Sequence, residues 1–443
     1  MPEHTPQYFR SYSPKHRVKF IRNDTGEDLF DVSNDLISLT TNKVYERAAG
    51  TWQMMLTYKA VSNNLGVIDT YDKHITTDDI VTIELDAGDG NGYKPVMMGL
   101  VDRVSFTRPG GNTPQRQVKI SGQDMGKLLL KHDIGWDIVA FNLITTENGD
   151  SDVQKIDAQL NRQFDVSLIT GTPPVMVEKL FKKVFSQVLP KWDPFFKVDT
   201  SNAKDDWVLW NPAIINLQGC SVWDMLTKCA HGPFNVLTAE TDDVGKKLFT
   251  ITLEDRPLDD YGRIIQNPDR QHIIFDSDII SDDVGICDTE RINFLFYQPT
   301  FYLTAAGMNI PIAMAHRDLV EWSEASIESH GYCSKTIKDE FVPPESKWRI
   351  PFVLPPPSVW LESAKEAKSK LWNWYRLNQD YWSGTIQTHL RPEIKAGHEL
   401  IHDLGNNKKM SYLIEQVTHQ YIVWPQLQFV TSLQVTRGQK YVE

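Results

Sequence analysis

The sequence has few cysteines, and they follow no pattern. Its four cysteines, Cys220, Cys229, Cys287 and Cys333, form no C-x-x-C pair and no even set of spacings in a chain of 443 residues. That distribution argues against a disulfide framework. We therefore expect reduced thiols, most of them buried.

Long apolar runs are also lacking. No stretch approaches the roughly 18 apolar residues of a membrane-spanning helix, and residues 1–20 lack the apolar core of a signal peptide. The sequence thus predicts no membrane association, with synthesis and assembly in the cytoplasm.

Basic residues are outnumbered by acidic ones. The 46 Lys and Arg residues against 58 Asp and Glu residues leave a formal net charge of −12. A protein whose main task is to bind a phosphate backbone needs a basic footprint, so that class of function is excluded. Much of the acid lies in adjacent pairs, for which solvated loops are the simplest interpretation. The pairs are Asp205-Asp206, Asp242-Asp243, Asp259-Asp260 and Asp282-Asp283.

The chain is long enough for several cores. At 443 residues it exceeds the size at which a single core keeps growing, so two to four domains are expected. Its hydrophobic content of 41% and charged content of 23% are those of an ordinary globular protein.

Residues 79–130 carry the clearest strand pattern. Val81, Ile83 and Leu85 alternate with polar residues, which predicts a half-buried strand, and residues 96–106 resume the pattern after a glycine-rich turn. Gly99 inside this second strand predicts a bulge or a close backbone approach. Residues 116–121 predict a third strand, followed by a short helix. Together with strands predicted over 36–45 and 50–58, they indicate a small antiparallel barrel.

The middle of the chain mixes helix and strand. Residues 174–188 have helical spacing between prolines, and Ser221 is suited to cap a helix over 222–230. Residues 234–239 and 247–253 then alternate around a turn, and residues 292–297 are strand-like. We predict an α+β region, with a sheet order that the sequence leaves open.

The last third begins with a proline-rich segment. Residues 342–357 contain six prolines and predict an extended linker before a helix that runs from Ser358 to about residue 379. Trp372, Trp374 and Tyr375 on this helix indicate core packing, with a partner-binding face as the alternative. Strands predicted over 384–390, 410–421 and 428–436 form a second small β domain. The predicted domains are residues 1–130, 131–341, 342–381 and 382–443.

Three stretches together resemble a known family. They are D-I-V-T-I-E-L at 79–85, M-G-L-V-D-R-V at 98–104 and K-I-S-G-Q-D-M-G-K-L-L at 119–129, preceded by Gly50-Thr51-Trp52-Gln53. They resemble the first tube-like barrel of central baseplate hub proteins (the late-control or hub family) from contractile-tailed bacteriophages. The C-terminal strands resemble the second barrel of the same family.

The resemblance implies an α+β, mainly β fold with two small antiparallel β-barrels flanking the middle region. It also implies a structural protein of the virion tail baseplate without catalytic residues or cofactor. Three copies would form a pseudo-sixfold ring that joins the sixfold tail tube to the threefold central spike. The partners would be the tail tube, spike, tape measure and baseplate wedge proteins, with DNA passing through the channel without specific binding. A contractile injection particle other than a phage would use the same hub.

For such a hub, subunit contacts matter more than catalysis. We expect ring contacts at two strands, and the residues are Gly99, Leu100, Val101, Asp102, Arg103, Leu413, Glu415 and Val417. An acidic channel wall is a further hypothesis, because DNA would slide past it without counterion release.

The alternative function is a zinc-dependent metallopeptidase. His398-Glu399-Leu400-Ile401-His402 matches H-E-x-x-H, in which two histidines on one helix face bind Zn²⁺ and the glutamate activates water. Lys408 stands where the extended metzincin pattern has a third histidine, and Pro392, Gly397 and residues 405–407 leave little room for a helix. In a strand the two histidines would lie about 13 Å apart, too far to share one ion.

Three other patterns carry weaker signals. Cys229 and His231 are two residues apart at a predicted helix end, a poor geometry for a nucleophile and its base. Residues 86–92 lack the oxygen ligands of a calcium loop and predict a hairpin turn instead. The paired carboxylates match no recognisable glycosidase motif.

Overall fold

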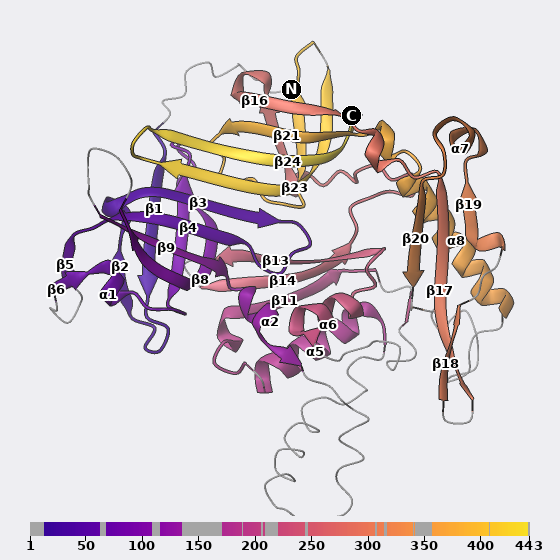
Figure 1. Cartoon of the computed structure of the whole chain (residues 1–443), viewed down its shortest axis with the longest axis horizontal. Helices are drawn as coiled ribbons and strands as arrows, with labels where there is room; N and C mark the ends of the chain where they lie inside the picture. Colours follow the sequence, from indigo (N-terminus) through magenta and orange to yellow (C-terminus); the bar gives the residue numbers. More distant parts are fainter. Residues whose placement is uncertain are drawn as a thin grey trace, which may run out of the picture.

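The computed structural model describes residues 13–62, 68–108, 116–134, 171–187, 189–204, 207–208, 220–243, 247–305, 308–313, 317–339, 341, 357–406 and 408–441. The fold is mainly β, as predicted, and its helices lie against the smaller sheets (Figure 1). Within the described ranges, no helix has the length and apolar content of a membrane span. The proline-rich stretch 342–356 and the acidic pair Asp205-Asp206 lie outside these ranges.

One sheet of 13 strands dominates the molecule. Its main path runs β16-β21-β24-β23-β3-β4-β9-β8-β7-β1-β2, and β22 and β15 continue it from one end of β23. The N-terminal strands are β1 (Lys15–Ile21), β2 (Asp28–Asp31), β3 (Leu36–Val44), β4 (Thr51–Thr57), β7 (Ile80–Asp86), β8 (Lys94–Thr107) and β9 (Gln117–Asp124). The others are β15 (Gln271–Phe275), β16 (Ile279–Ile286), β21 (Trp382–His389), β22 (Glu399–Asp403), β23 (Lys409–Ile422) and β24 (Gln428–Lys440).

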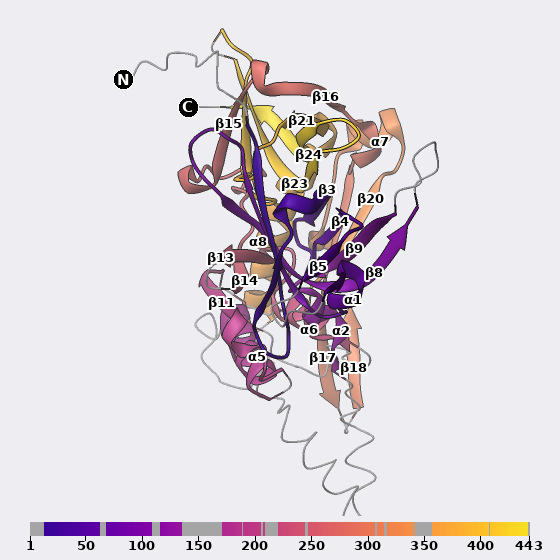
Figure 2. The ribbon, with the colours of Figure 1, turned by 90° about the vertical axis from the view of Figure 1, so that its left-hand side faces the viewer.

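The N-terminal and C-terminal strands meet in this sheet. β3 pairs with β23 in antiparallel register, so that Leu39 lies opposite Tyr421 and Asn42 opposite Thr418. Figure 2 shows the two sets of strands side by side, in indigo and yellow. Two closed barrels are therefore not confirmed: the described strands form one open sheet with two curled wings, because the edge of each predicted barrel is paired with the other. The predicted domain boundaries stay a prediction.

Each wing has its own apolar core. Trp52, Phe20 and Ile83 lie in the core of the N-terminal wing, and all are nearly inaccessible to solvent. Leu433 and Ile274 lie in the core of the C-terminal wing. Alternation along the strands explains both cores, since every second side chain points to the same face.

The middle region forms a separate layer. β13 (Asn235–Asp243) pairs with β14 (Leu248–Asp255), which pairs in parallel with β11 (Phe196–Asn202). The helices α2 (Lys127–Lys131), α5 (Pro173–Gln187) and α6 (Val222–Cys229) share one apolar core with this sheet. A short bridge of β10 (Asp133–Ile134) and β12 (Cys220–Ser221) lies beside them. Leu100 of β8 reaches the same core, which joins this layer to the large sheet.

A third unit forms one end of the molecule (Figure 1). β17 (Phe294–Ala305) pairs with β18 (Met308–Ala313), β19 (Val320–Trp322) and β20 (Ser334–Asp339), with α7 (Glu324–His330) between the last two. Helix α8 (Pro357–Tyr375) packs on this sheet. Its Trp374 is fully buried and donates from Nε1 to the Asp259 carbonyl at 2.7 Å, and Trp372 and Tyr375 pack beside it, which favours the packing interpretation.

Local predictions were confirmed where short-range chemistry decides the structure. The Ser221 hydroxyl accepts from the Asp224 amide at 3.1 Å, and the Asp224 carboxylate accepts from the Ser221 amide, which is a reciprocal cap of α6. The turn between β7 and β8 has Gly88 and Gly90 at positive φ, as a glycine-rich hairpin turn requires. A smaller hairpin, β5 (Ala60–Ser62) with β6 (Ile68–Thr70), and the short helix α1 (Tyr71–His74) precede it.

Candidate functional site

The H-E-x-x-H segment is a strand. Residues Glu399–Asp403 form β22, which pairs with β23 on one side and with β15 on the other. The Glu399 carboxylate is buried and accepts from the Gln271 amide at 2.7 Å and from the Ser411 hydroxyl. His402 is buried 3.4 Å from Asp276. Glu399 therefore ties three strands together, and the helical geometry that the peptidase mechanism requires is not the geometry of this segment.

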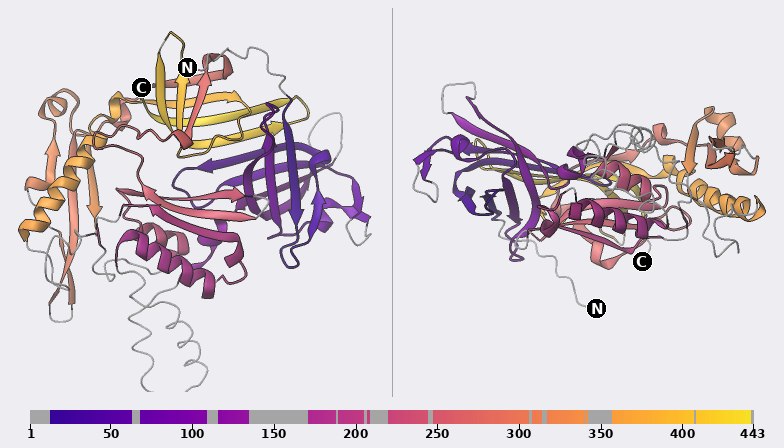
Figure 3. Two further views of the ribbon diagram at one scale, coloured as in Figure 1. Left: turned by 180° about the vertical axis from the view of Figure 1, so that it is seen from behind. Right: turned by 90° about the horizontal axis from the view of Figure 1, so that it is seen from below.

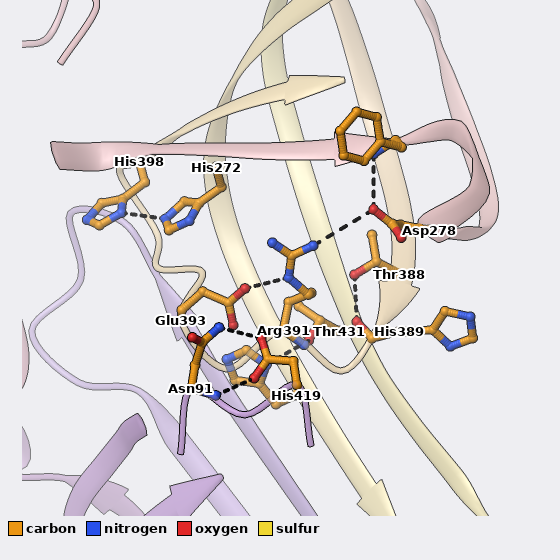
Figure 4. Close-up of polar contacts among 12 residues, drawn as sticks. Asn91, His272, Asp278, Thr388, His389, Arg391, Glu393, His398, His419 and Thr431 are labelled. Atoms are coloured by element: carbon orange, nitrogen blue, oxygen red, sulfur yellow. Dashed lines mark hydrogen bonds and ion pairs between the residues drawn. The ribbon is translucent and has the colours of Figure 1, made fainter. Parts of the chain in front are cut away.

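His398 is engaged with a histidine from another strand. Its Nδ1 lies 2.8 Å from Nε2 of His272, and the two rings stack with centroids 5.1 Å apart (Figure 4). Burial lowers the pKa of His272 to about 4. Burial, followed by repulsion from His272, lowers the pKa of His398 to about 3. Both rings are therefore neutral at pH 7, and one can donate to the other. Groups of three or more His, Cys, Asp or Glu side chains suited to a metal ion are absent from the described part of the chain.

A third neutral histidine lies beneath the same wing. His419 on β23 is buried, its Nδ1 lies 3.0 Å from the Thr431 hydroxyl, and burial lowers its pKa to about 4. Figure 4 shows it near Arg391, which bridges Glu393 and Asp278. Arg391 thereby ties the loop at 391–397 to the turn between β15 and β16.

Acid is expected to destabilise the folded chain between pH 6.5 and about pH 4. An unfolded histidine titrates near pH 6.5, so in this window the unfolded chain binds more protons than the folded one, and the free energy of unfolding falls as the pH falls. For His419 alone we expect a loss of about 2 kcal/mol between pH 7.5 and pH 5. Urea unfolding at both pH values measures it. In a His419→Gln variant the loss of unfolding free energy between the two pH values should be smaller than in the unchanged chain. The control is His330→Gln on α7, an exposed position, which should show the same loss as the unchanged chain. An equal loss in all three proteins would contradict the assignment.

A small cavity of mixed polar and apolar lining lies where the two wings and the middle layer meet. It measures about 40 Å³ and is lined by residues of β3, β8, β13, β23 and the loop at 391–397. Lys43 pairs with Asp124 at 2.7 Å, and Lys395 pairs with Glu240 at 3.3 Å. A cavity of this size holds a few water molecules and no substrate. It is a junction of the fold and not a binding site for a metabolite.

The predicted ring residues lie on β8 and β23, which have three other strands between them in the same sheet. Leu100, Val101, Leu413 and Val417 are buried in the chain's own cores, which removes their side chains from contact with a second subunit. Gly99 packs against the Trp52 ring, and Asp102 pairs with Lys127. The exposed members are Arg103 and Glu415. Alternating patterns mark strands, but burial of one face or the other depends on tertiary packing.

An exposed apolar edge was missed from the sequence. β16 is the last strand of the main sheet path, and its Ile280 and Ile286 are 48% and 61% exposed. Trp382 lies opposite Ile286 on β21 and is 41% exposed, and Ile273 and Phe275 of β15 are each 50% exposed. Large apolar side chains on an edge strand are a liability unless something covers them. Their alternation was the available signal, but residues 271–286 also contain polar and acidic residues that suggested a loop.

The acidic pairs serve different local purposes. Asp259 accepts from the amides of Tyr261 and Arg263 at 2.9 Å each and so closes a turn. Asp260 lies 3.3 Å from Lys370. Asp282 and Asp283 are exposed on β16. The described pairs thus lie on different elements, and the acidic channel wall stays a hypothesis.

The Cys229–His231 pair has no nucleophile geometry. Cys229 is buried, and burial raises the pKa of its thiol to about 12. His231 instead lies 3.0 Å from Asp339.

Two solved structures have the same architecture over almost the whole chain. The tail protein from Neisseria meningitidis MC58 superposes with a TM-score of 0.51 at 11% identity, covering 96% of this chain and 97% of that one. The 43 kDa tail protein of prophage MuSo2 from Shewanella oneidensis gives 0.50 at 13% identity, covering 96% and 98%. This chain has the fold of those two tail proteins. No protein-family model and no curated protein sequence matches it.

Proposed function

We propose that the chain is the structural hub of a contractile phage-tail baseplate. The observation that carries the proposal is one open sheet with two curled wings, inside a fold shared with a tail protein and a prophage tail protein. Three copies would contribute six wings, and six similar wings around one axis match a sixfold tube while the chains keep threefold symmetry. Such a ring would join the tail tube to the central spike and line the DNA channel.

The exposed apolar edge supports a contact between copies of this chain. Among the described strands β16 pairs only with β21, and its Ile280 and Ile286 are exposed, with Trp382 opposite Ile286. The opposite end of the sheet is β2, a four-residue strand. A head-to-tail contact between these ends would cover the apolar residues and close a ring, because heterologous contacts repeat around an axis. Arg103 and Glu415 remain proposed contacts at the ring, through their exposed side chains.

The remaining partners follow from this placement. The tail tube protein would lie on one side of the ring, the spike on the other, and the wedge proteins around it, in a virion tail assembled in the host cytoplasm. The tape measure protein and the DNA would pass through the centre. In this function the chain binds and positions, and catalyses no reaction.

Light scattering of the purified full chain is expected to give the mass of a trimer. Ile286→Asp should shift the protein to monomer, since a carboxylate would be buried in the contact, whereas Ile68→Asp, 72% exposed on β6, should leave the trimer intact. A chain that stays monomeric at all concentrations would contradict the hub.

Elemental analysis of the same sample tests the peptidase: stoichiometric zinc that disappears in His402→Ala would favour it.

A further inference from the structure

A large part of the outward face of the joined sheet is built from uncharged hydrogen-bonding side chains, and Val44, Val430 and Met55 border that part. One cross-strand row shows this, in which each residue lies directly opposite the next on six successive strands from β21 to β9. Its members are Gln387, Ser432, Thr418, Asn42, Thr51 and Gln123. Residues directly opposite in antiparallel strands point to the same face. The row therefore crosses the junction of the two wings without a charge and without a large apolar group.

The rows on either side have the same chemistry over part of their length, up to Val430 in one row and Val44 in the other. On one side Gln420, Thr40, Gln53 and Ser121 lie opposite one another, from β23 to β9. On the other side Thr385, Gln434 and Gln416 follow across β21, β24 and β23. All of these side chains are at least partly exposed. We call these thirteen positions the neutral face.

Charge is found on the other side of the same strands or at the margins of the face. Lys43 lies between Asn42 and Val44 on β3 but points inward, where it pairs with Asp124. The outward charges nearest to the face are Arg103 and Lys119 on one margin, Asp283 on the other, and Glu415, which is exposed at the bulge before Gln416 on β23. A soluble surface has about 25–35% charged residues, which would place three or more on thirteen positions.

Such a face is unsuited to docking and suited to sliding. A stable protein interface has an apolar core with aromatic or methionine anchors, which this face lacks. Without cations it releases no counterions from a phosphate backbone, and without carboxylates it does not hold basic protein segments. Its amides and hydroxyls stay hydrated. A polyanion or an extended protein would therefore pass over it with little adhesion.

We infer that the neutral face is the wall of the central passage, over which a nucleic acid slides. The inference rests on the proposed ring and replaces the hypothesis of an acidic wall. It assigns the task to named strands: β21, β24, β23, β3, β4 and β9 point this face toward the axis.

Thiol labelling of the assembled ring tests the assignment. Thr418→Cys and Gln53→Cys are made separately, in a background with Cys287→Ser and Cys333→Ser, and light scattering first establishes that the ring forms. The probes are biotin-maleimide, which is small enough to enter the passage, and streptavidin, which is not. We expect both positions to react with biotin-maleimide and to bind streptavidin only after urea dissociates the ring.

The outcomes separate the two proposals. A chain that forms no ring contradicts the proposed function, and the passage wall falls with it. If the labelled positions bind streptavidin without urea, the neutral face lies on the outside of the ring. If both thiols stay unreacted, the neutral face is buried between subunits. Either result overturns the assignment of the passage wall and leaves the proposed ring standing. Ser329→Cys on the exposed helix α7 checks that streptavidin binds a labelled folded protein.

Discussion

Alanine in place of Gly122 is expected to prevent stable folding of the N-terminal wing. A Cβ at this position would lie 1.9 Å from the Leu100 carbonyl oxygen and 2.7 Å from the Trp52 ring. Trp52 is 2% exposed and also packs against Gly99, so it has no free space to move into. Overpacking in a core costs about 1–3 kcal/mol, and a backbone clash adds to that, against a total stability of about 5–15 kcal/mol.

Urea unfolding followed by Trp fluorescence measures this effect. The matched control is Gly285→Ala on β16, where a Cβ meets nothing within 4 Å, and its stability should change by less than about 0.5 kcal/mol. If Gly122→Ala and Gly285→Ala unfold at the same urea concentration, the close approach of Trp52 to β9 is wrong.

Removal of the Asp339 carboxylate is expected to have the second-largest effect. The carboxylate lies 3.0 Å from His231 Nε2 and accepts from the Tyr297 hydroxyl at 2.6 Å and from the Phe341 amide at 3.0 Å. Asp339, His231 and Tyr297 are all buried. Asp339→Ala would leave His231, the Tyr297 hydroxyl and the Phe341 amide, all three buried, without this partner, which costs about 3–5 kcal/mol.

A double-mutant cycle separates this pair from its surroundings. The combined His231→Leu and Asp339→Leu variant should lose less stability than the sum of the single variants, because neither partner is then left unpaired.

Burial opposes ionisation of Asp339, but His231, the Tyr297 hydroxyl and the Phe341 amide outweigh it and lower its pKa. The Asp339 contribution is therefore present above about pH 4 and is lost as the pH falls through the lowered pKa. In the double-mutant cycle, additive losses of stability would show that His231 and Asp339 are not coupled.

Sequence patterns predicted the local elements well because those elements depend on neighbours in the chain. Ser221 caps α6 through a residue three positions away, and the glycine-rich turn joins β7 to β8. Of the bulge or close backbone approach predicted at Gly99, the close approach was confirmed, with the Gln123 carbonyl as the nearest neighbour and Trp52 next to it. The helices at 173–187 and 357–375 also lie close to their predicted ranges.

The arrangement of the wings was beyond the reach of such patterns. β3 pairs with β23 across most of the chain length, and β15 and β16 leave the middle region to extend the C-terminal wing (Figure 3). Alternation specifies that a strand has two different faces, but it does not specify the partner strand, since backbone hydrogen bonds are the same for every sequence. Two small barrels and one open sheet therefore have the same local pattern.

For the candidate sites, too, some features can be read from the sequence and others depend on the tertiary structure. The sequence by itself determined that H-E-x-x-H lacks room for a helix, and that the chain is mainly β, acidic overall and free of long apolar runs. Only the tertiary structure decided that Leu100 and Leu413 are buried, that Ile286 is exposed, and that Ser, Thr, Asn and Gln from six strands form one uncharged face. The physical reason is that a surface is assembled from distant segments, and its chemistry exists only once their register is set.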